Sequence, residues 1–131
     1  MTELHGWLAV RDTPADEDRL PPGATERIMN GVREIAAETD CVKLTPANGE
    51  LYLSTLFCSN HRTPEVDEII GAYRKIAELA SGSYGMILLR DDEDSAHSNE
   101  FVTYIFKRGV CSVRTDSDFS PCVPTIEDGI S

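Results

Sequence analysis

The sequence lacks several features that mark other classes of protein. It has 12 basic residues against 23 acidic ones, and aromatic residues make up 7% of its 131 positions. No apolar stretch approaches the ~20 residues that span a bilayer. No basic segment followed by an apolar run marks a signal peptide at the N-terminus. We therefore expect a cytoplasmic protein that does not associate with membranes.

The shortage of positive charge narrows the class of partner. A formal net charge of −11 repels phosphate backbones, so direct binding to nucleic acid is disfavoured. The same charge attracts a basic partner and speeds its capture at low salt. Acidity also serves solubility alone in many proteins, so the charge by itself does not choose a function.

The sequence has four cysteines, Cys41, Cys58, Cys111 and Cys122. In a cytoplasmic protein these thiols are expected to be reduced. Cys41 and Cys111 lie in or beside apolar runs and are predicted to fill the core. Cys58 and His61 have a C-x-x-H spacing, but no second close pair completes the four ligands of a structural zinc site. We expect no metal and no other cofactor.

Recognisable catalytic motifs are missing. There is no nucleophile elbow, no P-loop and no histidine-rich metal motif, and His5, His61 and His97 are isolated in the sequence. The sequence therefore favours a protein that binds a partner over an enzyme.

Apolar residues at helical spacing predict two helices. Residues 64–80 form the clearer one, with Thr63 as its N-cap and with Gly82 just past its end, where a left-handed residue commonly stops a helix. Residues 24–39 form the other, which Gly31 weakens by about 1 kcal/mol relative to alanine.

Short apolar or alternating runs predict six strands, at residues 5–11, 41–44, 51–57, 84–89, 101–106 and 110–113. The Asn48-Gly49 dipeptide predicts a hairpin turn between the second and third strands. The order of elements is that of a split βαβ unit with a C-terminal hairpin. We expect one α+β domain over residues 1–131, a mainly antiparallel sheet with two helices on one face. The strand order stays open, and residues from about 115 onward are predicted to form a packed coil.

The run Asp91, Asp92, Glu93 and Asp94 is the most distinctive feature. It follows a buried strand, which places it at the mouth of a long hairpin loop. The carboxylates could ligate a hard cation, neutralise cations of a partner, or simply face water. The run lacks the alternating spacing of a calcium loop. Neighbouring strand-end residues also point to opposite sides, which disfavours convergence on one ion.

Several segments together resemble a known family, in the same order along residues 5–128. They are HGW at 5–7, NHR at 60–62, GSYG at 82–85, RDDED at 90–94, NEF at 99–101, RG at 108–109 and DFSPCVPTIED at 118–128. This set resembles the immunity protein 7 family (Imm7) of bacterial polymorphic toxin systems. Residues 13–23 and 95–98 match nothing in that pattern.

The resemblance implies an intracellular antidote that binds and neutralises a cognate toxin, without catalysis of its own. If the toxin is a nuclease, its substrate channel is basic because it grips phosphate, and an acidic loop could occupy that channel. Trp7 and Phe119 would be apolar anchors. The expected toxin contacts are Asp91, Asp92, Glu93, Asp94, Glu100, Trp7 and Phe119. The alternative is a regulatory domain that senses a small ligand, which rests on fold analogy alone.

Overall fold

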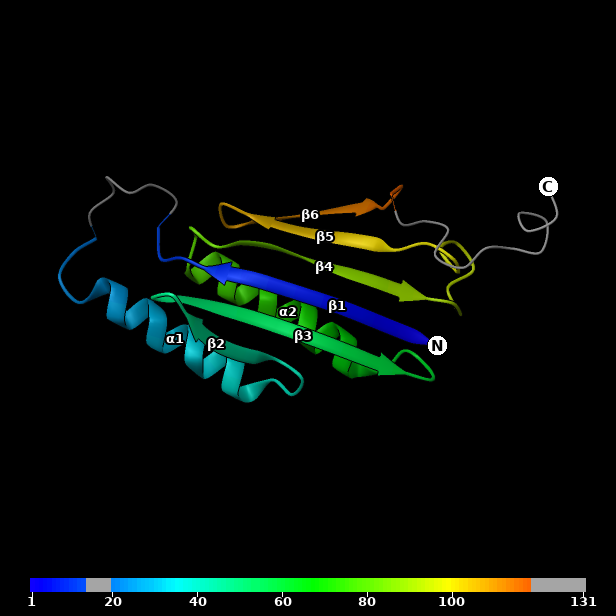
Figure 1. Cartoon of the computed structure of the whole chain (residues 1–131), viewed down its shortest axis with the longest axis horizontal. Coiled ribbons are helices and arrows are strands. Elements are labelled where there is room, and N and C mark those ends of the chain that lie inside the picture. The colour runs from blue at the N-terminus through cyan, green and yellow to red at the C-terminus, as the bar shows by residue number, and fades with distance from the viewer. Residues whose placement is uncertain (14–19, 119–131) are drawn as a thin grey trace.

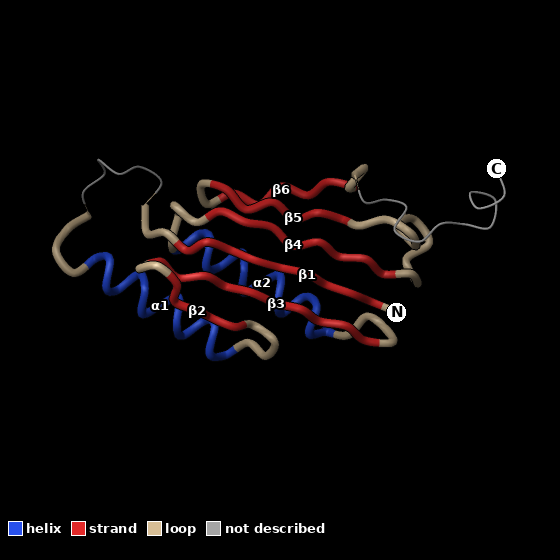
Figure 2. The backbone as a smooth tube through the Cα atoms, viewed as in Figure 1, coloured by secondary structure: helices blue, strands red, loops and turns tan. Residues whose placement is uncertain are grey.

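Six antiparallel strands and two helices make up the computed structural model, which describes residues 1–13 and 20–118 (Figure 1). Both helices lie on the same face of the sheet, as Figure 2 also shows. The elements are β1 (Thr2–Val10), α1 (Ala24–Glu38), β2 (Lys43–Ala47), β3 (Glu50–Ser59), α2 (Pro64–Leu79), β4 (Tyr84–Asp91), β5 (Val102–Lys107) and β6 (Val110–Thr115). Neither helix of this described part is long and apolar enough to cross a membrane.

The strands are ordered β2-β3-β1-β4-β5-β6, and every neighbouring pair is antiparallel. The elements from β1 to β4 form the split βαβ unit, and the β5–β6 hairpin extends the sheet beyond β4. This confirms the predicted α+β fold. The strand order places β1, the first strand of the chain, in the interior of the sheet between β3 and β4.

The core lies between the sheet and the helices. Side chains alternate along a strand, so every second residue of β1 points toward the helices, and Leu4 and Leu8 are fully buried there. The register places Leu4 beside Phe57 of β3 and Leu89 of β4. The helices contribute buried apolar residues at helical spacing, namely Val32 and Ala36 of α1 and Val66, Ile69, Ile70, Tyr73, Ile76 and Ala77 of α2.

Tyr73 carries the only hydroxyl among the buried residues of α2, and the sheet satisfies it. Its hydroxyl donates to Thr55 Oγ1 of β3 at 3.0 Å. Burial raises the pKa of Tyr73 to about 12, and the hydrogen bond to Thr55 offsets a part of that rise. The group is therefore a neutral donor at any physiological pH.

Both tight hairpins have two-residue turns with positive φ at each position. Asn48 and Gly49 have φ of 53° and 78°, which confirms the predicted turn. Arg108 and Gly109 repeat this geometry between β5 and β6, with φ of 53° and 75°.

Of the two predictions about the ends of α2, the N-cap residue is confirmed and the left-handed glycine is wrong. Thr63 occupies the N-cap position of α2, but its side chain makes no capping hydrogen bond and its hydroxyl instead contacts Glu65 Oε2 at 3.3 Å. Gly82 is not among the glycines with positive φ. Glycine is required at this position because the chain after β1 passes close to it. A Cβ there would lie 1.8 Å from the carbonyl oxygen of Thr13.

The prediction that Cys41 fills the core is also wrong. The strand begins at Lys43, so Cys41 falls in the turn after α1, where it is exposed and has a φ of 67°. Cys111 does pack against the core, and partial burial raises the pKa of its thiol. Cys41, Cys58 and Cys111 are free thiols, while Cys122 lies outside the described residues.

Two glycines provide a matched test of the fold. A Cβ on Gly85 would lie 2.1 Å from the carbonyl oxygen of Trp7, a backbone atom that cannot move aside, whereas a Cβ on Gly71 of α2 would meet nothing within 4 Å. We expect Gly85→Ala to lower the free energy of unfolding by at least about 2 kcal/mol. Gly71→Ala should raise it by about 0.5–1 kcal/mol, the helix preference of alanine. Urea denaturation measures both, and equal stability of the two variants would contradict the β1–β4 packing.

Candidate functional site

The acidic run begins at the end of β4 and continues into the loop that joins β4 to β5. These strands are adjacent and antiparallel, which confirms that the run lies at the mouth of a long hairpin loop. Three successive turns shape the loop. Each is closed by a backbone hydrogen bond: Asp94 N–H to Asp91 O at 3.1 Å, His97 N–H to Asp94 O at 3.1 Å, and Glu100 N–H to His97 O at 3.2 Å.

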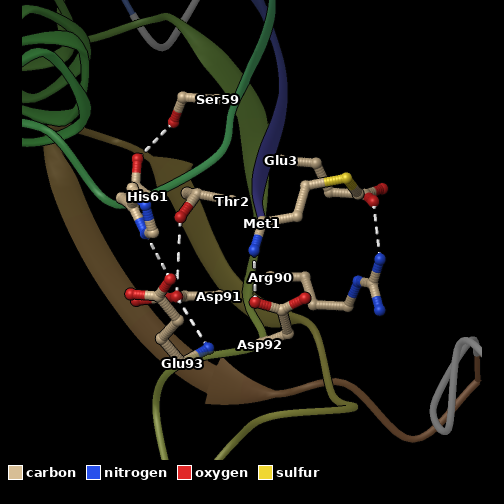
Figure 3. A network of polar contacts seen from close by, with 9 residues as sticks. All are labelled: Met1, Thr2, Glu3, Ser59, His61, Arg90, Asp91, Asp92 and Glu93. Carbon is tan, nitrogen blue, oxygen red and sulfur yellow. Dashed lines mark hydrogen bonds and ion pairs between the residues drawn. The ribbon is translucent and has the colours of Figure 1, made fainter.

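Two of the four carboxylates stabilise the backbone of this loop. Asp91 Oδ1 accepts a hydrogen bond from the Glu93 N–H at 3.0 Å and one from Thr2 Oγ1 at 3.5 Å (Figure 3). Asp94 Oδ1 accepts one from the Ala96 N–H at 3.0 Å. Aspartate side chains that accept from an N–H two residues on are typical of turns. These two residues therefore set the shape of the loop.

The other two carboxylates attach the loop to its neighbours. Asp92 pairs with the N-terminal ammonium of Met1, and its N–H donates to Met1 O at 3.1 Å. Glu93 pairs with His61, which precedes α2 (Figure 3). Both carboxylates stay exposed, Asp92 at 44% and Glu93 at 51%. The hydrogen bond from the N-terminal ammonium, with the charges of Arg90 and His61, lowers the pKa of Asp92.

The four carboxylates therefore point to different partners and do not converge. Within residues 1–13 and 20–118, no group of three or more His, Cys, Asp or Glu side chains could hold a metal ion. His61 of the C-x-x-H motif contacts Glu93, not Cys58. What the loop offers is a fixed arrangement of exposed negative charge.

Glu100 and Trp7, two further predicted contacts, lie outside this run. Glu100, at the far end of the loop, places Oε1 3.7 Å from Nδ1 of His97. Trp7 lies in the middle of β1, opposite Met86, five residues from the Thr2–Asp91 pair. At ~3.4 Å per residue that separation is about 17 Å, so Trp7 belongs to a different surface from the loop. Phe119 lies outside the described residues.

Sequence reasoning missed a polar cluster below the loop. Glu3 Oε2 accepts from Arg90 Nη2 at 2.9 Å, and both side chains are largely buried, at 19% and 11% exposed. His5 Nε2 lies 2.9 Å from Glu3 Oε1, and its ring packs edge-on against Phe101 at a centroid distance of 6.0 Å. Glu3 and Arg90 are 87 residues apart, so only the strand order brings them together. The one available signal is that His5, Arg90 and Phe101 each fall in a motif segment.

Burial and ion pairing act in opposite directions on Glu3. Burial would raise the pKa of its carboxyl, but the hydrogen bonds with His5 and Arg90 and the positive charge of Arg90 outweigh it, so the pKa is lowered. The carboxylate is therefore charged, and its ion pair with Arg90 links β1 to β4 directly behind the loop.

The fold and this loop define a small α+β protein with a row of exposed carboxylates in a hydrogen-bonded loop. The chain belongs to the immunity protein 7 family (Imm7), whose sequence model matches residues 1–128. No curated protein and no solved structure matches the chain. The resemblance inferred from the motifs is thereby confirmed, and with it the general role: family members are immunity proteins, which bind a cognate toxin and are generally not enzymes.

The lowered pKa of Glu3 predicts how stability depends on pH. A carboxyl whose folded pKa is depressed stabilises the fold above its unfolded pKa, and this stabilisation is lost as the pH falls through the folded pKa. We expect Glu3→Gln to cost about 1.5–3 kcal/mol at pH 7, the range for hydrogen bonds to charged groups. The difference should shrink below pH 4.5, the ordinary value for glutamate.

Denaturant titrations at several pH values measure this difference. Glu78→Gln, at an exposed position of α2, is the control and should change stability by less than about 0.5 kcal/mol. A Glu3→Gln effect that persists undiminished at acid pH would show that the carboxylate charge is not the cause.

Proposed function

We propose that this protein neutralises its cognate toxin by binding to it in the cytoplasm and covering its active site or substrate channel. The observation that carries the proposal is the acidic loop, whose exposed carboxylates are held in place before any partner arrives. Family membership supports the toxin as the partner. The net charge of −11 favours a toxin with a basic surface.

A fixed loop suits an inhibitor, because little conformational entropy remains to be lost on binding. Asp91 and Asp94 hold the turns, while Asp92 and Glu93 bind neighbouring segments, and the side chains of Asp92, Glu93 and Asp94 are all exposed. The existing ion pairs leave room for a partner, since a carboxylate has two oxygens and about four lone-pair sites. A lysine or arginine of the toxin can therefore bind without breaking them.

The kind of toxin we propose is a nuclease. Enzymes that grip a phosphate backbone do so with lysine and arginine, and a row of carboxylates can take the place of the phosphates. Inhibition then requires no chemistry by this chain, only occupation of the channel. The comparisons give no support to a ligand-sensing role.

Removing the charges of Asp92 and Glu93, which do not hold the turns, tests the loop. We expect Asp92→Asn with Glu93→Gln to slow association with the toxin about 3- to 10-fold at low salt, with the effect shrinking as salt is added, because exposed charges act mainly on the association rate. The matched control is Glu34→Gln with Glu38→Gln, which removes the same charge from exposed positions of α1. It should change the rate less than about twofold.

Stopped-flow association at two salt concentrations measures these rates, and a thermal melt of each variant checks the fold. Equal slowing by both double variants would mean that only net charge matters and that the loop is not a contact. If the unchanged protein neither binds the toxin nor protects cells that produce it, the proposed function itself is wrong.

A further inference from the structure

The face of the sheet opposite the helices, here called the open face, has neither α1 nor α2 over it (Figure 2). Strand alternation and register determine which side chains point there: Trp7 of β1 lies beside Met86 of β4, and Met86 beside Ile105 of β5. The large apolar side chains of the open face are Trp7, Tyr52, Leu56, Tyr84, Met86, Leu88, Ile105 and Val110.

Many of these side chains are exposed far beyond what folding requires. Leu56 is 69% exposed, Val110 61%, Tyr84 45% and Trp7 43%. Trp7 and Tyr84 pack edge to face at a centroid distance of 6.2 Å. With Met86 they line an open pocket of about 410 Å³. Clustered exposed apolar residues with aromatic members mark interaction sites, and tryptophan and tyrosine are enriched at interface hot spots.

The charge of the open face is opposite to that of the molecule. By register, its strand residues include two carboxylates, Glu3 and Glu50, against four cations, Lys43, Arg90, Lys107 and Arg114. Arg11 and Arg108 extend the cationic side at the pocket. In a chain with a net charge of −11, the acidic residues must therefore gather elsewhere, on the helices and in the loops.

This surface has the size of a protein interface. Six strands at ~4.8 Å spacing and nine residues at ~3.4 Å give a face of roughly 24 Å by 27 Å. That area approaches the ~800 Å² that each partner contributes to a standard interface. A second copy of the chain is a poor match, because two cationic borders would then face each other.

We propose that the open face is the main docking surface for the toxin, and that it receives an apolar toxin patch bordered by carboxylates. This rests on the proposed function and adds a second contact of different chemistry: the acidic loop meets a basic part of the toxin, and the open face meets an apolar and acidic part. The two contacts together fix the orientation of the toxin along the strands.

A matched pair of substitutions tests the proposal in the full-length chain. Leu56→Glu places a carboxylate on the open face, and Val113→Glu places one on β6, where Val113 is 52% exposed but points to the helix side. We expect Leu56→Glu to weaken affinity for the purified toxin 10- to 100-fold, mainly through faster dissociation. Val113→Glu should change it less than about threefold. Equal effects of the two variants would overturn the proposal.

Trp7 supplies a second readout, because it is the only tryptophan. A 5-fluorotryptophan label gives one ¹⁹F signal from the chain and none from the unlabelled toxin. The signal should be open to a soluble paramagnetic quencher in the free protein at every concentration and protected when toxin is added. Protection in the dilute free protein would mean that the chain's own residues cover the face, and protection that grows with concentration would mean a second copy. Either result overturns the proposal.

The two proposals fail in different ways. If the toxin binds without protecting Trp7 from the quencher, and Leu56→Glu binds the toxin as tightly as the unchanged protein does, the proposed docking surface is wrong. The immunity function would still stand. A toxin that does not bind the unchanged protein at all would overturn the function, and the docking surface with it.

Discussion

Tyr73 of α2 lies against Gly6, in the middle of β1, and this contact determines how the helix lies on the sheet. A Cβ at Gly6 would come within 2.8 Å of the Tyr73 hydroxyl, so any larger residue would push the ring away. From that position the ring reaches Thr55 of β3 through its hydroxyl and Phe106 of β5 at a centroid distance of 5.8 Å. One side chain thus connects α2 to three strands.

The same contact shows which residues of β1 face the helices and which face away from them. Because α2 packs on the Gly6 side of β1, the neighbouring residues His5 and Trp7 point to the open face. His5 supports Glu3 and Phe101 beneath the acidic loop, and Trp7 contributes to the apolar surface further along the strand. The HGW segment therefore combines a packing glycine with one residue for each of the two candidate contacts.

Charge is distributed to match this division. The acidic loop emerges at the end of the sheet where β1 begins, and the open face beside it is apolar with a cationic border. A uniformly acidic protein would attract any basic molecule, including many wrong ones. An apolar face with the opposite charge at its edge adds a requirement that a merely basic partner does not meet, and so increases specificity.

Much of the fold could be predicted because its signals are local. The apolar spacing in α2, the Asn48-Gly49 turn and the order of elements each depend on residues close together in the chain. The family motifs could also be recognised in the sequence. The strand order could not be predicted, since it depends on contacts such as Glu3 with Arg90. The apolar run beside Cys41 predicts a place in the core, whereas the turn after α1 occupies that position.

The candidate site was only partly predictable for the same reason. The acidic run and its place in a hairpin loop followed from sequence order alone. The separate tasks of its members did not, because Asp91 and Asp94 hold turns while Asp92 and Glu93 reach the N-terminus and His61. The open face could not be predicted, because only the register of the six strands places Trp7, Tyr84 and Leu56 on one surface.

We propose that this protein disables a toxin by occupying it. The most direct measurement is a titration of the purified toxin's activity with the purified protein, at toxin concentrations well above the dissociation constant. Occupation predicts a linear fall in activity that reaches its minimum at one protein per toxin and recovers when the complex dissociates. Activity that stays constant, or that one protein removes from many toxin molecules, would contradict the account.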